Sequence, residues 1–184
     1  MSDTSELQRF LPKDQELLSG ILYRIGYWIS HIDDTDEGDR SEQIEHQHLL
    51  GCLNKISKAP KAGTLLNEMA EESCRQEQSW PRWETKNDSI LDDVAAAVSL
   101  LKSQGTEDEE KSFTKASMMV GMTVARAFRE EPEHAVEHEG YFAWLTEKAN
   151  DMILAVTDKD AHKDLGVSPE EDNALNDLLA ILKS

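Results

Sequence analysis

The 184-residue chain has only two cysteines, no long apolar run and no signal-like N-terminus. Cys52 and Cys74 lack the spacing of a metal knuckle or a Cys-x-x-Cys redox pair, so we expect reduced thiols packed in or near the core. No apolar run approaches the roughly 18 residues that a membrane span needs. The polar, acidic residues 1–6 have neither a basic nor an apolar region, which argues against a secretory signal. We therefore expect a cytoplasmic protein that does not insert into a membrane.

Basic residues are scarce: 19 Lys and Arg stand against 37 Asp and Glu, for a net charge of −18. Such a surface repels nucleic acid, because the phosphates carry the same sign. It suits cations, a basic protein partner, or simple solubility. We expect a protein partner and no nucleic acid, and the composition leaves the oligomeric state open.

Catalytic motifs are also missing. The chain has no Gly-x-Ser-x-Gly sequence and no Cys-His arrangement suited to nucleophilic catalysis. Its nine glycines are scattered singly, so no glycine-rich loop is present to bind phosphate. These absences favour a non-enzymatic protein.

Helical periodicity, by contrast, runs through almost the whole chain. The first stripe has four-three spacing, which places its members on one face of a long helix: Leu18, Leu22, Ile25, Ile29 and Ile32. Further helices are predicted to start at caps at Asp39, Asp88, Thr106 and Ser168, another is predicted to open at Thr64, and a sixth helix is predicted around Tyr141 to Val156. The third is predicted to end at Trp80-Pro81, and Gly105 to be a left-handed residue ending the fourth. All five prolines fall at predicted boundaries, so we predict an all-α chain of about seven helices in one domain.

The chain also contains a faint echo of itself. An offset of ninety-five residues aligns Gly26 with Gly121, Glu42 with Glu137, and Leu50 with Leu145. An echo at a fixed offset is typical of two copies of one supersecondary unit. We therefore predict two helix–acidic loop–helix units, at about 15–58 and 107–156, packed as one bundle and followed by a C-terminal helix at 168–183.

The first acidic loop is a candidate cation site. Asp33, Asp34 and Asp36, with Glu42 in the next helix, offer the oxygen ligands that Ca²⁺ or Mg²⁺ prefers. The EF-hand pattern fits poorly, because Ile44 occupies its twelfth position. The alternative is a solvated loop whose carboxylates favour the N-terminus of the following helix.

The histidines and nearby glutamates suggest two other metal sites. Glu45 with His48, and Glu131 with His134, are Glu-x-x-His pairs, which build di-iron or di-manganese sites in ferritin-like bundles and would make the chain a di-metal oxidoreductase. Pro132 interrupts the second pair, and no bundle-interior glutamates are evident. A zinc site is the other possibility, from His46, His48, His134 and His138, but no cysteine joins them. Otherwise these side chains are expected to be exposed at the surface.

The echoed unit resembles the TerB-like family of the tellurite-resistance group. The first copy is residues 27–34 followed by Gly38 and Glu42, and the second is residues 124–129 followed by Glu137. Residues 165–171, Leu-Gly-Val-Ser-Pro-Glu-Glu, look like the family's closing segment. The resemblance implies a cytoplasmic seven-helix fold, a stress or metal-resistance context, partner proteins at the membrane, and no catalytic activity. If the acidic turns bind a divalent cation, it implies Asp33 and Glu42 as ligands in the first copy and Glu137 in the second.

Overall fold

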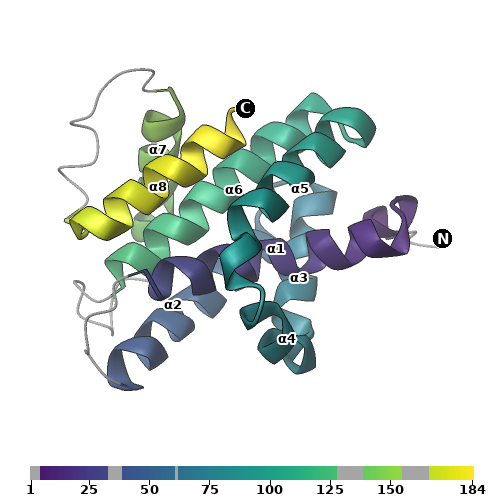
Figure 1. Ribbon diagram of the computed structural model, residues 1–184. Helices are drawn as coiled ribbons and strands as arrows, with labels where there is room; N and C mark the ends of the chain where they lie inside the picture. The colour runs from purple at the N-terminus through teal and green to yellow at the C-terminus, as the bar shows by residue number, and fades with distance from the viewer. Residues whose placement is uncertain (1–4, 33–38, 61, 128–138, 155–165) are drawn as a thin grey trace.

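The computed structural model describes residues 5–32, 39–60, 62–127, 139–154 and 166–184. These residues form eight α-helices, three short 3-10 helices and no strand (Figure 1). The α-helices are α1 (Pro12–Ser30), α2 (Asp39–Lys58), α3 (Thr64–Arg75), α4 (Trp80–Glu84), α5 (Ile90–Gln104), α6 (Glu107–Arg126), α7 (Glu139–Leu154) and α8 (Pro169–Leu182). The 3-10 helices are η1 (Glu6–Arg9), η2 (Glu77–Ser79) and η3 (Asn87–Ser89). The predicted all-α class is confirmed.

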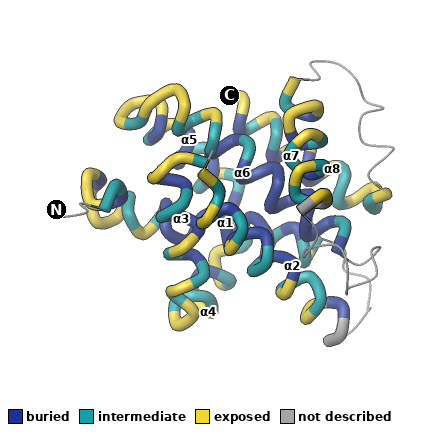
Figure 2. The backbone as a smooth tube through the Cα atoms, turned by 180° about the vertical axis from the view of Figure 1, so that it is seen from behind, coloured by how far each residue is buried: buried dark blue, intermediate teal, exposed yellow. Residues whose placement is uncertain are grey.

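Helices α1 and α6 form the centre of the bundle. They cross each other, and α1 also packs against α2, α3, α4 and α5, whereas α6 also packs against α2, α3, α5, α7 and α8 (Figure 1). Both are buried around most of their circumference, α1 continuously from Leu18 to Gly26 and α6 from Ala116 to Ala125. A helix buried on all sides belongs in the interior, so these two helices carry one core that all the others cover (Figure 2).

The predicted caps at Thr106 and Ser168 agree with the structure. Thr106 and Ser168 each cap a helix in a full capping box, in which the hydroxyl accepts from the backbone N–H of Glu109 or Glu171. Each glutamate in turn accepts from the backbone N–H of its cap residue, at 2.8 Å in both cases. Among the described prolines, Pro12 and Pro169 stand in the first turns of α1 and α8.

Three local predictions are wrong. The third helix ends at Arg75, and Trp80-Pro81 begins the additional short helix α4, because proline fits the first turn of a helix as well as it ends one. Within the described residues, helix α4 is therefore the one α-helix beyond the seven that the sequence predicts. The fourth predicted helix, α5, is preceded by Ser89 rather than capped by Asp88. Gly105 ends it with φ −96° and ψ −170°, which is extended rather than left-handed.

The length and apolarity of the helices bear on the prediction that the chain does not insert into a membrane. None of the described helices combines the length and the apolarity required to cross a bilayer.

The echoed glycines make different contacts. A Cβ on Gly26 would lie 2.3 Å from Leu49 Cδ1, so this glycine lets α1 and α2 approach closely. The equivalent Gly121 faces α8 instead, where a Cβ would lie 2.9 Å from Leu175 Cδ2. The two units therefore use the shared glycine against different helices, and the repeat stays a prediction.

Two contacts on α1 fix the segment that contains α4. Gly20 leaves room for the buried indole of Trp83, whose Cε2 would lie 2.7 Å from a Cβ at that position. One turn further, the buried Arg24 donates to Asp93 Oδ2 at 2.6 Å and to the backbone carbonyl of Lys86 at 2.9 Å. The segment between α3 and α5 is thus held against α1 at Trp83 in its middle and at Lys86 near its C-terminal end.

Replacing Gly20 with alanine tests the first of these contacts. The new methyl group must displace a rigid, buried indole, which costs about 1–3 kcal/mol in an overpacked core. Alanine recovers only about 1 kcal/mol through its higher helix propensity. We therefore expect Gly20→Ala to lower the free energy of unfolding, measured by urea denaturation. Gly140→Ala is the matched control, since a Cβ there meets nothing within 4 Å and Gly140 also lies in a helix. Equal stability of the two variants would contradict this packing.

Candidate functional site

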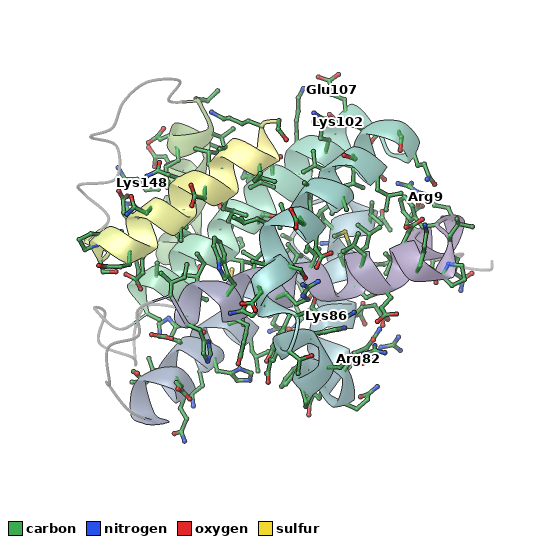
Figure 3. All side chains as sticks on the ribbon, viewed as in Figure 1. Arg9, Arg82, Lys86, Lys102, Glu107 and Lys148 are labelled. Atoms are coloured by element: carbon green, nitrogen blue, oxygen red, sulfur yellow. The ribbon has the colours of Figure 1, made fainter. Side chains whose placement is uncertain are left out.

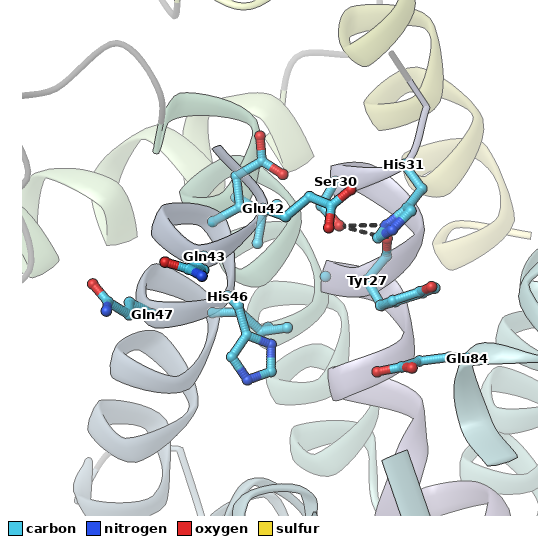
Figure 4. Close-up of a pocket in the computed structure, with 12 residues that line it drawn as sticks. Tyr27, Ser30, His31, Glu42, Gln43, His46, Gln47 and Glu84 are labelled. Atoms are coloured by element: carbon cyan, nitrogen blue, oxygen red, sulfur yellow. Dashed lines mark hydrogen bonds between the residues drawn. The ribbon is translucent and has the colours of Figure 1, made fainter. Parts of the chain in front are cut away.

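A polar cleft opens between the C-terminal half of α1 and the N-terminal half of α2, with α4 at one side (Figure 4). Its volume is about 560 Å³, within the range of about 300–1,000 Å³ that is common for ligand sites. Helix α1 supplies Tyr27 and Ser30, and His31 follows directly as its C-cap. Helix α4 supplies Glu84, and α2 supplies Glu42, Gln43, Glu45, His46 and Gln47. Gly26, Leu49 and Val124 add apolar wall.

Stacked rings form the α1 wall of the cleft. Tyr23, Tyr27 and His31 follow one another at four-residue spacing, with Tyr27 and His31 stacked at a centroid distance of 4.0 Å. Trp80 stacks on Tyr23 at 5.0 Å, and the His46 ring approaches Trp80 edge-on at 5.1 Å. These rings connect α1, α2 and the start of α4, so the cleft has a rigid aromatic side.

The Glu84 carboxylate is held in place by a buried tyrosine. The Tyr23 hydroxyl donates to Glu84 Oε1 at 2.8 Å. Burial raises the pKa of Tyr23 well above its ordinary value, and the hydrogen bond to the Glu84 carboxylate and its charge raise it further. Tyr23 is therefore neutral and permanently available as a donor, which fixes the side chain of Glu84 at the cleft.

The field inside the cleft is negative. Burial raises the pKa of Tyr27, and so do the charges of Glu84 and then Glu42. Neither of these two carboxylates has an ion-pair partner within the described ranges. No Lys or Arg is among the described residues that line the cleft. Two carboxylates from different helices thus act on one tyrosine without a counter-charge.

The basic side chains near the cleft are engaged elsewhere or lie outside it. Arg82, on the same short helix as Glu84, pairs with Glu16 of α1 at 3.1 Å. Figure 3 shows Arg9 beside the N-terminal end of α1 and Lys102 near the end of α5, whereas the cleft lies at the C-terminal half of α1. The cleft therefore combines the net acidity of the chain with a local lack of positive charge.

The predicted cation site is placed only in part. Asp33, Asp34 and Asp36 lie outside the described residues, as does Glu137 of the second copy. Glu42 is exposed in the first turns of α2 and lines the cleft. Within the described ranges, no three His, Cys, Asp or Glu side chains are grouped so as to hold a metal ion. The calcium or magnesium site stays a prediction.

The di-metal and zinc predictions also stay open, because Glu131, His134 and His138 lie outside the described residues. Of the remaining candidates, Glu45 lines the cleft, whereas His48 is only 3% exposed. The expectation that the histidines are exposed surface residues is wrong for His48, which is buried, and for His46, which packs against the aromatic wall. Residues two apart on a helix face different directions, so His46 and His48 cannot share a ligand.

The thiols and large apolar side chains serve packing, as expected. Both cysteines are free, and burial raises the pKa of Cys52 to about 11, which leaves it a poor nucleophile at neutral pH. Trp83, Met118 and Met122 are buried in the core, and Trp28, Trp80 and Trp144 pack against it.

Sequence reasoning missed most residues of the cleft, among them Tyr27, His31 and Glu84. The first two could have been found, since the four-residue spacing of Tyr23, Tyr27 and His31 places them on one face of the predicted first helix. Glu84 carried a weaker signal. Only by treating Trp80-Pro81 as a helix start would it have fallen on a structured element.

Comparison of the chain with protein-family models, with curated proteins and with solved structures finds no match. The TerB-like resemblance therefore stays a prediction from the residues that suggested it.

The Tyr23–Glu84 contact makes stability depend on alkaline pH. Because the folded-state pKa of Tyr23 is raised above 10.0, its contribution is complete below that pH and declines as the pH rises above it. Near neutrality, Tyr23→Phe should cost about 1–2 kcal/mol for the lost hydrogen bond. Above pH 10 the difference between wild type and variant should shrink by about 1.4 kcal/mol per pH unit. Urea denaturation of both proteins between pH 8 and pH 11 measures this. A difference that is constant over the whole range would contradict the raised pKa.

Proposed function

We propose that this chain is a non-enzymatic, TerB-like binding module that acts by protein–protein interaction, with the cleft between α1, α2 and α4 as its contact surface. One observation carries the proposal: the cleft is lined by the carboxylates of Glu42 and Glu84, and no described residue that lines it is basic. An uncompensated negative cleft on a chain of net charge −18 attracts a positively charged partner and accelerates its association.

A divalent cation is part of the same proposal. Residues 33–38 connect α1 to α2 in the chain, so Asp33, Asp34 and Asp36 belong to the connection between the two helices that form the cleft. Glu42 contributes a carboxylate from the following helix. These oxygens would bind Ca²⁺ or Mg²⁺, and the ion would adjust the charge that a partner meets. The resemblance places such a module in a cytoplasmic response to metal or tellurite stress.

Thermal unfolding in the presence of single metal ions tests the cation. After EDTA treatment, Ca²⁺ or Mg²⁺ at a hundredfold excess over its dissociation constant should stabilise the folded protein by about 2.7 kcal/mol. For a chain of this size that corresponds to roughly 5–10 °C in Tm. The Asp33→Asn, Glu42→Gln double variant should lose this rise.

Glu147→Gln is the matched control, since Glu147 is exposed on α7 and its loss changes the net charge without touching the cleft. It should keep the full rise. A rise that persists in the double variant would refute the proposed ligands. A rise with anaerobic Fe²⁺ or Mn²⁺ alone would refute the non-enzymatic proposal in favour of the di-metal oxidoreductase.

A further inference from the structure

We infer that the cleft between α1, α2 and α4 binds the guanidinium of an arginine in a basic segment of a protein partner, with Glu84 and Glu42 as its two carboxylate acceptors. This inference rests on the proposed function, because it names the chemistry by which the same cleft recognises its partner. It does not require the divalent cation, because Glu84 is not one of the predicted metal ligands.

The size of the cleft favours a side chain over a bare ion. A volume of about 560 Å³ is far larger than one metal ion needs, and the described residues provide no group of three metal ligands. A guanidinium is wide and planar, and its five N–H donors can reach two carboxylates that stand apart. Glu84 and Glu42 come from different helices and both act on Tyr27, so they flank a shared space (Figure 4).

Glu84 is prepared for this role. Its Oε1 already accepts from the Tyr23 hydroxyl, and its carboxylate has no second hydrogen-bond donor among the described residues. A carboxylate that is hydrogen-bonded through one oxygen keeps its position without a ligand. Binding therefore costs little conformational entropy for that side chain. Charge-assisted hydrogen bonds between guanidinium and carboxylate are about twice as strong as neutral ones.

The aromatic wall adds shape. Tyr27, His31 and His46 line the cleft, and the Tyr27 and His31 rings stack on one another at a centroid distance of 4.0 Å. The methylene stem of an arginine packs well against such apolar faces while its charged end reaches the carboxylates. Acidic residues alone would attract any cation, whereas two carboxylates beside aromatic rings favour a cation that has several N–H donors and an apolar stem.

Fluorescence polarisation with a short labelled peptide tests the inference. The probe has one central arginine between glycine and serine residues, and the comparison peptide has neutral citrulline in its place. In EDTA at low ionic strength, we expect binding of the arginine peptide and at least tenfold weaker binding of the citrulline peptide. Glu84→Gln and Glu42→Gln should each weaken the arginine peptide about tenfold.

Glu84→Gln is informative because a glutamine oxygen still accepts from Tyr23, so the fold should be retained while the charge is lost. Urea denaturation of the variant checks this. Glu147→Gln removes the same charge on α7 and should leave binding unchanged. Equal weakening by Glu147→Gln would show bulk charge attraction only and would overturn the inference. Binding of spermidine in place of the peptide, or equal binding of both peptides, would overturn it as well.

Two variants separate this inference from the metal proposal. Asp33→Asn should abolish the stabilisation by Ca²⁺ or Mg²⁺ and leave peptide binding intact. Glu84→Gln should do the reverse. A metal effect without any arginine binding would refute the inference alone, and arginine binding without a metal effect would refute only the cation.

Discussion

The burial of α1 on nearly all sides is the constraint on which the rest of the structure depends. From Leu18 to Gly26 every residue of this helix is buried, including the polar Ser19 and Arg24. Such a helix must satisfy its polar groups inside the protein and tolerate close neighbours. Arg24 does so through Asp93 and the backbone near α5, and Gly20 and Gly26 admit Trp83 and α2 at short range. The positions of α2, α4 and α5 follow from these contacts.

The cleft is a consequence of the same constraint. Tyr23 belongs to the buried run, yet its hydroxyl needs a partner, and the partner is Glu84 from α4. Tyr27 and His31, one and two turns later, come to the surface and form the wall. Burial thus decreases along one face of α1, from the core contact at Tyr23 to the cleft wall at the C-terminal end of the helix. Helix α4 is short, but it supplies the carboxylate that makes this surface negative.

Sequence patterns predict the structure correctly where it depends on residues within a single helix. The stripe from Leu18 to Ile29 and the boxes at Thr106 and Ser168 predicted their elements because caps and periodicity are local. The patterns failed at Trp80-Pro81, where a proline can end one helix or begin another and tertiary packing of Trp83 on Gly20 decides. The patterns also failed to predict that His48 is buried. His48 lies outside the apolar stripe of Leu49, Leu53 and Ile56, so only the tertiary packing of α2 shows its burial. The cleft depends on how α1, α2 and α4 come together in three dimensions, and only Glu42, Glu45 and His46 of its lining were candidate site residues in the sequence.

The predicted cation site and the cleft are electrostatically coupled, because they share a carboxylate. Glu42 is the one residue shared by the predicted cation ligands and the described cleft. A cation bound with Asp33 would therefore neutralise part of the charge that faces Tyr27, whereas Glu84, tied to Tyr23, would keep its own. Occupancy by Ca²⁺ or Mg²⁺ and occupancy by a guanidinium would then compete through Glu42 alone. By reciprocity, a basic partner would lower the affinity for the ion by the same factor. An acidic module of this design could report divalent cations through the partner it releases.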